Sequence, residues 1–211
     1  MHEYAEITHF KHTIKGTELL VTIPKKSIGD YLKKFGNGGV VKAELRLDDG
    51  RTISAEQRKK AYATIRDIAL HTGHIPEELK EILKYYYMAE TGEQYFSLSN
   101  CSMTTAKEYI NYLIEFCLRW NIPLKESGLE RTDDINTYLY MCLRHKKCCI
   151  CGLDGEIHHW EAIGMGHDRK NYDDSNNEKI ALCRKHHTEV HAIGRDTFAK
   201  KYKVYGIIFN E

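Results

Sequence analysis

Two pairs of potential metal ligands near the C-terminus constrain the fold of this chain more than any other feature. Cys148 and Cys151 form a C-x-x-C pair with Gly152 beside the second thiol, and Cys183 and His186 repeat the same separation further along. Two such pairs are typical of a closed, tetrahedral zinc site, in which a tight turn directs two thiolates at one ion. The sequence therefore predicts one structural zinc ion held by Cys148, Cys151, Cys183 and His186.

The other cysteines leave alternatives open. The chain has seven cysteines in 211 residues. We expect Cys101, Cys117 and Cys142 to lie in the core, and Cys149 to point inward between the ligands. Cys149 could replace a neighbouring ligand, and Cys142 with His145 also has the spacing of a pair. A third interpretation is that all these cysteines are buried free thiols, which is common for this residue type.

Four histidines in the same two stretches of sequence remain after the zinc ligands are assigned. His187 and His191 would face the same way if their segment is helical, because residues four apart are neighbours on a helix. His158 and His159 are adjacent, so on a strand they would point to opposite faces. We therefore predict a second, catalytic metal held by His158, His187 and His191, with His159 as general base. The alternative is an all-structural metal cluster or a solvated histidine-rich surface.

The second metal would be a divalent cation bound by few protein ligands, which leaves positions open for phosphate oxygens and water. The candidate ions are Mg²⁺, Mn²⁺ or another transition metal. Three imidazoles are an unusual ligand set for Mg²⁺, which prefers oxygen, and they suit Mn²⁺ or another transition metal better.

The first two thirds of the chain predict short strands followed by helices. "ELLVTIP" and "GVVKAELRL" have strand composition. A capping box of Ser54 and Gln57 predicts a helix that ends at Gly73. Pro76 is expected to open a second helix that buries Leu79, Ile82, Leu83 and Tyr86. A third helix is expected from Thr104 or Thr105 to Pro123, burying Tyr109, Ile110, Leu113, Cys117 and Trp120.

These elements predict an α+β fold: an N-terminal mixed strand and helix domain, residues 1–122, and a small zinc-stabilised domain, residues 135–211. The polar, turn-rich segment 123–134 is the expected linker, and a helix from Asp134 to His145 is expected to follow it. No apolar run approaches the roughly 20 residues of a membrane span. The first residues lack the apolar segment of a secretory signal, so we expect a cytoplasmic protein with reduced thiols.

The C-terminal stretch "CCICG…EIHHW…ALCRKHHTEVH" resembles the HNH endonucleases, whose ββα-metal core is stabilised here by zinc. The resemblance covers about Cys148 to Tyr205. "GMGHDRKNYDD" and "IGRDTFAKKYKVYGI" are similar to a phage-associated branch of these nucleases, and the paired histidines before H-x-x-x-H also resemble the colicin nucleases. The resemblance implies metal-dependent DNA cleavage with His159 as general base. It also implies an asparagine that holds a loop between strands, for which Asn177 is nearest and Asn176 adjoins it.

The N-terminal part resembles the NinB/Orf recombination mediators of lambdoid phages. The resemblance lies in "VVKAELRLDDGRTISAEQRKKAYATIRDIA" and "FSLSNCSMTTAKEYINYLIEFCLRWNIPL". It implies a homodimer that binds single-stranded DNA, with a host recombinase or single-strand binding protein as a further partner.

Candidate DNA contacts are basic residues in two regions of the chain. Net charge is only +1, so any contact must come from local patches. The candidates are Arg58, Lys59 and Lys60, with Arg51 nearby, and Arg169, Lys170 and Arg184 around the metal sites. The prediction is a phage recombination protein with metal-dependent endonuclease activity on single-stranded or branched DNA. The alternatives are a non-cleaving DNA-binding mediator and a restriction- or toxin-type nuclease.

Overall fold

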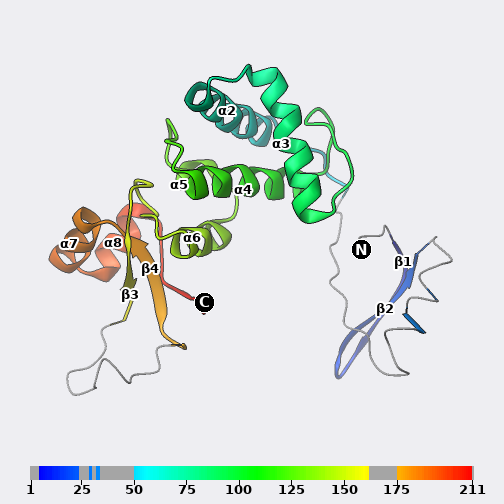
Figure 1. Ribbon diagram of the computed structural model, residues 1–211. Coiled ribbons are helices and arrows are strands. Elements are labelled where there is room, and N and C mark those ends of the chain that lie inside the picture. Colours follow the sequence, from blue (N-terminus) through cyan, green and yellow to red (C-terminus); the bar gives the residue numbers. More distant parts are fainter. Residues whose placement is uncertain (1–4, 24–28, 30–31, 34–49, 162–174, 211) are drawn as a thin grey trace.

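The computed structural model describes residues 5–23, 29, 32–33, 50–161 and 175–210. Its first elements are β1, Glu6–Thr13, and β2, Gly16–Thr22, which form an antiparallel hairpin (Figure 1). Gly16 at the turn has φ 132°, a value that favours glycine. The strand expected around "ELLVTIP" is therefore confirmed, whereas the strand expected over 39–47 lies outside the described residues.

Three long helices follow: α2, Ala55–Thr72; α3, Pro76–Thr91; and α4, Met103–Trp120. The capping box at the start of α2 is confirmed, since Ser54 accepts from the N–H of Gln57 while the Gln57 side chain accepts from that of Ser54. Gly73 ends α2 in the left-handed conformation. Ser102 caps α4, so this helix begins one residue before the predicted start.

Several details of these helices differ from the prediction. Helix α3 buries Tyr87, and Tyr86 and Ile82 are 52% and 36% exposed, because the buried stripe advances four residues at a time through Leu79 and Leu83. Trp120 is 62% exposed, since it lies at the last position of α4, beyond the edge of the core. Helix α4 ends in a left-handed Asn121, before Pro123 is reached.

The segment predicted as a linker, 123–134, is packed into the fold. It contains the short helix α5, Gly128–Arg131. Arg131 is 2% exposed, and its guanidinium donates to Asp67 and Glu126, both at 2.9 Å, and to Thr64 at 3.0 Å. The division into two domains at this segment stays a prediction.

The C-terminal part begins with the predicted helix, α6, Ile135–Arg144, whose N-cap is Asp134. A small antiparallel sheet has the order β3, Glu156–His159; β4, Glu178–Leu182; and β5, Ile207–Ile208. Helices α7, Arg184–Ile193, and α8, Arg195–Tyr202, complete this part (Figure 1).

The elements confirm the expected α+β class. A single cluster of buried apolar side chains extends from Ile53 to Phe209, because α6 packs against both α4 and β4. None of the helices in the described ranges has the length and apolar character that crossing a bilayer would require.

Candidate metal centres

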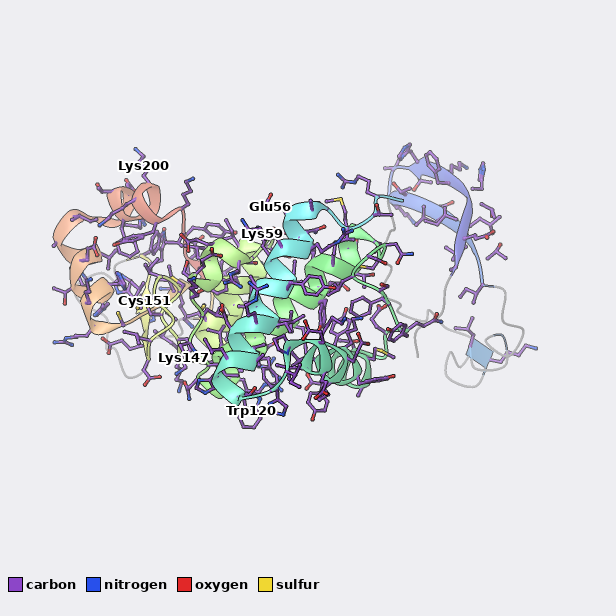
Figure 2. The ribbon with its side chains drawn as sticks, turned by 90° about the horizontal axis from the view of Figure 1, so that it is seen from above. Glu56, Lys59, Trp120, Lys147, Cys151 and Lys200 are labelled. Atoms are coloured by element: carbon purple, nitrogen blue, oxygen red, sulfur yellow. The ribbon has the colours of Figure 1, made fainter. Side chains whose placement is uncertain are left out.

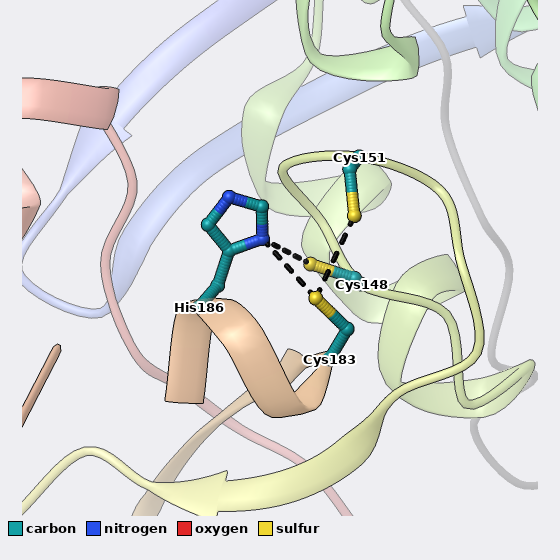
Figure 3. Close-up of side chains that lie close together, drawn as sticks. All are labelled: Cys148, Cys151, Cys183 and His186. Carbon is teal, nitrogen blue, oxygen red and sulfur yellow. Dashed lines mark hydrogen bonds between the residues drawn. The ribbon is translucent and has the colours of Figure 1, made fainter. Parts of the chain in front are cut away.

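The first centre is formed by a turn and the start of a helix. Cys148 and Cys151 lie in the tight turn after α6, which is closed by a 2.8 Å hydrogen bond from the Gly152 N–H to the Cys148 carbonyl. Cys183 precedes α7 and His186 lies in its first turn. The two segments meet so that all four side chains point toward one another (Figure 3).

The distances in this cluster suit a tetrahedral ion. Nδ1 of His186 lies 3.3 Å from Sγ of both Cys148 and Cys183, and Sγ of Cys151 lies 3.7 Å from that of Cys183. Zinc with its usual bond lengths implies ligand–ligand separations of roughly 3.5–3.8 Å. Three thiols and one imidazole are also the ligand types that zinc selects in structural sites. The predicted four residues therefore form a cluster that fits zinc.

The pKa values in the cluster are compatible with metal binding. Burial raises the pKa of the Cys148 thiol to about 12, so without an ion this thiol stays protonated at neutral pH. Metal binding would convert it to the thiolate and release the proton. Burial likewise lowers the pKa of His186, which keeps its imidazole neutral and able to bind.

The residues considered as alternative zinc ligands have other surroundings in the structure. Cys149 and Cys142 are buried in the core, as expected, and neither belongs to a group of potential ligands within the described ranges. The imidazole of His145 lies 2.9 Å from a Glu115 carboxylate oxygen instead of facing Cys142. Cys101 and Cys117 are also buried, as predicted.

The second centre is a triad of histidines from β3 and α7. The ring centroid of His158 lies 4.6 Å from that of His187 and 5.0 Å from that of His191, and the last two are 4.9 Å apart. One nitrogen from each ring lies within 4.8 Å of the others. Helix α7 thus supplies His186 to the first centre and His187 to the second.

The triad is suited to a divalent cation because the ring of His158, at its centre, is neutral. Burial, then the neighbouring His187, His191 and His159, lower the pKa of His158 to about 4. Its imidazole is therefore unprotonated near pH 7, and only that form has a lone pair for a metal. The three potential ligands would leave further coordination positions open, as in catalytic sites.

Of the two predicted catalytic residues, one lies on β3 and the other lies just before β4. His159 follows His158 on β3 and pairs across the sheet with Lys179 of β4. Because successive side chains of a strand point to opposite faces of the sheet, His159 lies on the face opposite to His158 and the triad. Asn177 precedes β4 in the same loop as Asn176.

The predicted DNA contacts have mixed surroundings. Arg58 donates to the carbonyls of Leu98 and Ser99, at 2.9 and 2.8 Å. Lys60 lies 2.6 Å from Asp133 and 3.3 Å from Glu56. Lys59 is exposed on α2 (Figure 2), and Arg184 is exposed at the start of α7. Arg58 and Lys60 therefore have partners within the fold. The two other candidates, Arg169 and Lys170, lie outside the described residues.

One residue near the triad was missed from the sequence. A carboxylate oxygen of Glu156, on β3, lies 3.3 Å from Nδ1 of His187. The alternation of side chains along a strand could have identified Glu156 from the sequence, since it is two residues before His158 and shares its face.

Comparison with known proteins agrees with this geometry. A family model described as "Putative HNHc nuclease" matches residues 30–210, which is most of the chain and includes helices α2 to α4 as well as both metal centres. Searches of curated proteins and of solved structures returned no match. Because the match covers well over half of the sequence, the chain belongs to this HNH nuclease family.

Proposed function

We propose that this protein is a metal-dependent endonuclease that hydrolyses phosphodiester bonds in DNA. The observation that carries the proposal is the triad of His158, His187 and His191, whose ligand nitrogens lie within 4.8 Å of one another in a chain of the HNH family. A structural zinc ion at the four-residue cluster would hold α7 against the turn after α6, and so place two of the three histidines.

Each residue of the site has a proposed task. His158, His187 and His191 would hold one divalent cation, which when bound supplies Lewis-acid stabilisation of charge on the scissile phosphate. His159 would accept a proton from the attacking water, a role suited to a group whose usual pKa is near 6.5. Asn177 would hold the loop before β4 in place. Arg184 and Lys59, both exposed, would contact phosphates.

A cleavage panel tests this function. Protein with its zinc retained is assayed with Mg²⁺, Mn²⁺, Ni²⁺ or Zn²⁺ on linear duplex, single-stranded and branched DNA. We expect cleavage that a chelator abolishes and that is highest with a transition metal, since imidazole suits these ions better than Mg²⁺. No cleavage of any substrate with any ion would refute the proposal.

The role in phage recombination is a narrower proposal, and the resemblance of the N-terminal part to NinB/Orf proteins supports it. It includes a homodimer, single-stranded DNA, and a host recombinase or single-strand binding protein as partner. Preference for branched or single-stranded DNA in the panel would favour this role. Cleavage at a defined duplex sequence would favour a restriction-type nuclease, and binding without cleavage would favour the mediator.

A further inference from the structure

One carboxylate lies against the histidine triad. Oε1 of Glu156 lies 3.3 Å from Nδ1 of His187. Among the described residues, no other carboxylate forms an ion pair with His158, His187 or His191. Glu156 is also separate from the group whose ligand atoms lie within 4.8 Å of one another. The carboxylate therefore contacts a potential ligand without belonging to the ligand set.

The backbone around the zinc cluster holds Glu156 in place. The N–H of the preceding Gly155 donates to the Lys146 carbonyl at 2.8 Å, and Glu156 itself pairs with Leu182, next to Cys183. Gly155 is packed closely, because a Cβ there would lie 3.0 Å from the backbone nitrogen of Cys148. The start of β3 is thus anchored on the turn that carries two zinc ligands.

The contact bears on which nitrogen of His187 is available. Nδ1 faces the carboxylate at ion-pair distance, 3.3 Å, outside hydrogen-bond geometry. A negative carboxylate beside Nδ1 favours the tautomer that carries its proton there, which leaves the lone pair on Nε2. Histidines that bind metals commonly donate their other N–H to a carboxylate in this way. We infer that Glu156 is a positioning residue, which fixes the tautomer and ring orientation of His187 so that Nε2 is presented to the divalent ion.

This inference rests on the proposed function, because it assigns Glu156 a task at the proposed catalytic centre. Its competitor is an ordinary surface ion pair, since the side chain of Glu156 is 55% exposed and that of His187 is 27% exposed. An ordinary pair at such exposure would contribute little to stability and nothing to metal affinity. Metal affinity therefore separates the two interpretations.

The test measures Ni²⁺ binding by titration calorimetry in full-length protein whose zinc content is first verified. Glu156→Ala is expected to weaken Ni²⁺ binding by about 10–100-fold, which is typical for loss of a partner behind a metal ligand. Glu156→Gln is expected to bind with intermediate affinity, because its amide oxygen keeps a partial negative charge beside Nδ1 but loses the full charge of the carboxylate. Glu178→Gln is the matched control: this glutamate is exposed on the neighbouring strand, and its variant should bind like the parent.

The outcomes are distinguishable. Parent-like affinity in Glu156→Ala would overturn the inference and leave an ordinary ion pair. Equal losses in Glu156→Gln and Glu156→Ala would also overturn it, since a carboxylate that binds the ion itself cannot be replaced by an amide. A parent that keeps its zinc but neither binds Ni²⁺ nor cleaves DNA at any metal concentration would refute the proposed function instead.

Discussion

Adjacent histidines carry different proposed tasks in this protein. His158 contacts the rings of His187 and His191, whereas His159 pairs across the sheet with Lys179. Successive side chains of a strand point to opposite faces of the sheet, so one histidine can bind the metal while the next acts as general base. The same alternation places Glu156 on the triad-facing side.

His159→Ala is therefore expected to lower the cleavage rate by about 10²–10⁴-fold, the usual loss for a general base. Binding of Ni²⁺ should persist, because the triad is intact. His187→Ala and His191→Ala should instead weaken metal binding, so that high metal concentration partly restores cleavage. Single-turnover assays at rising metal concentration measure the difference.

The two phenotypes must separate for the assignment to hold. Cleavage at the parent rate by His159→Ala, with contaminating nuclease excluded by a matched preparation, would remove this residue from the chemistry. A loss in His159→Ala that high metal repairs would mean that the tasks of His158 and His159 are exchanged.

Two buried tyrosines offer a matched comparison of hydrogen bonding. The hydroxyl of Tyr109 has no hydrogen-bond partner in the described structure, and burial raises its pKa. The hydroxyl of Tyr138 donates to the Cys149 carbonyl at 3.0 Å. Tyr109→Phe is expected to raise the free energy of unfolding by about 1 kcal/mol, and Tyr138→Phe to lower it by about 1–2 kcal/mol. Urea denaturation followed by circular dichroism measures both, and equal effects would contradict the assignment of the partners.

At the scale of the element, α7 connects the two metal centres. Cys183 lies at its start, His186 belongs to the zinc-type cluster, and His187 and His191 belong to the triad. The helix has no side-chain hydrogen bond at its N-cap, where Cys183 stands. An ion bound at the first centre would therefore anchor the helix that supplies the second.

Cys148→Ser is expected to lose the zinc ion and to lower the thermal unfolding midpoint, because metal-binding energy contributes directly to folding of so small a unit. Ni²⁺ binding at the triad should weaken with it. Cys149→Ala is the matched control, since this neighbouring thiol is equally buried but lies outside the cluster. Elemental analysis and calorimetry check both. Zinc-free parent protein, together with a Cys148→Ser variant that melts like it, would show that the cluster holds no structural metal.

At the scale of the whole molecule, the helices and the metal-binding part share one core. Helix α6 packs against α4 on one side and β4 on the other. Lys147, in the turn that precedes the zinc ligands, contacts Asn121 at the end of α4. The segment between the two parts is anchored by Arg131, whose guanidinium is buried against Asp67 of α2.

Arg131→Met is expected to lower the free energy of unfolding by about 3 kcal/mol or more, because it leaves Asp67 partly buried without its cation. Arg144→Met should change it by less than about 1 kcal/mol, because the Arg144 side chain is 58% exposed and pairs with Glu115 at the surface. Urea denaturation should show a single transition in both variants if the two parts unfold together. Separate unfolding transitions for the N-terminal helices and for the C-terminal metal-binding part would instead support independent domains.

The sequence by itself determined the features that depend on near neighbours. Ligand spacing predicted both groups of potential metal ligands, and the capping box at Ser54 and Gln57 identified the start of α2. Such signals depend on residues three or four positions apart, which helix and turn geometry bring together whatever the rest of the chain does. The α+β class followed from the same local patterns.

Only the tertiary structure decided the features that depend on distant partners. It buried Tyr87 in place of Tyr86 and turned the predicted linker into a packed segment around Arg131. It also placed Glu156 against His187. These outcomes depend on which elements pack together, because a side chain's burial and partners are set by the neighbouring helix or strand, which local spacing does not specify.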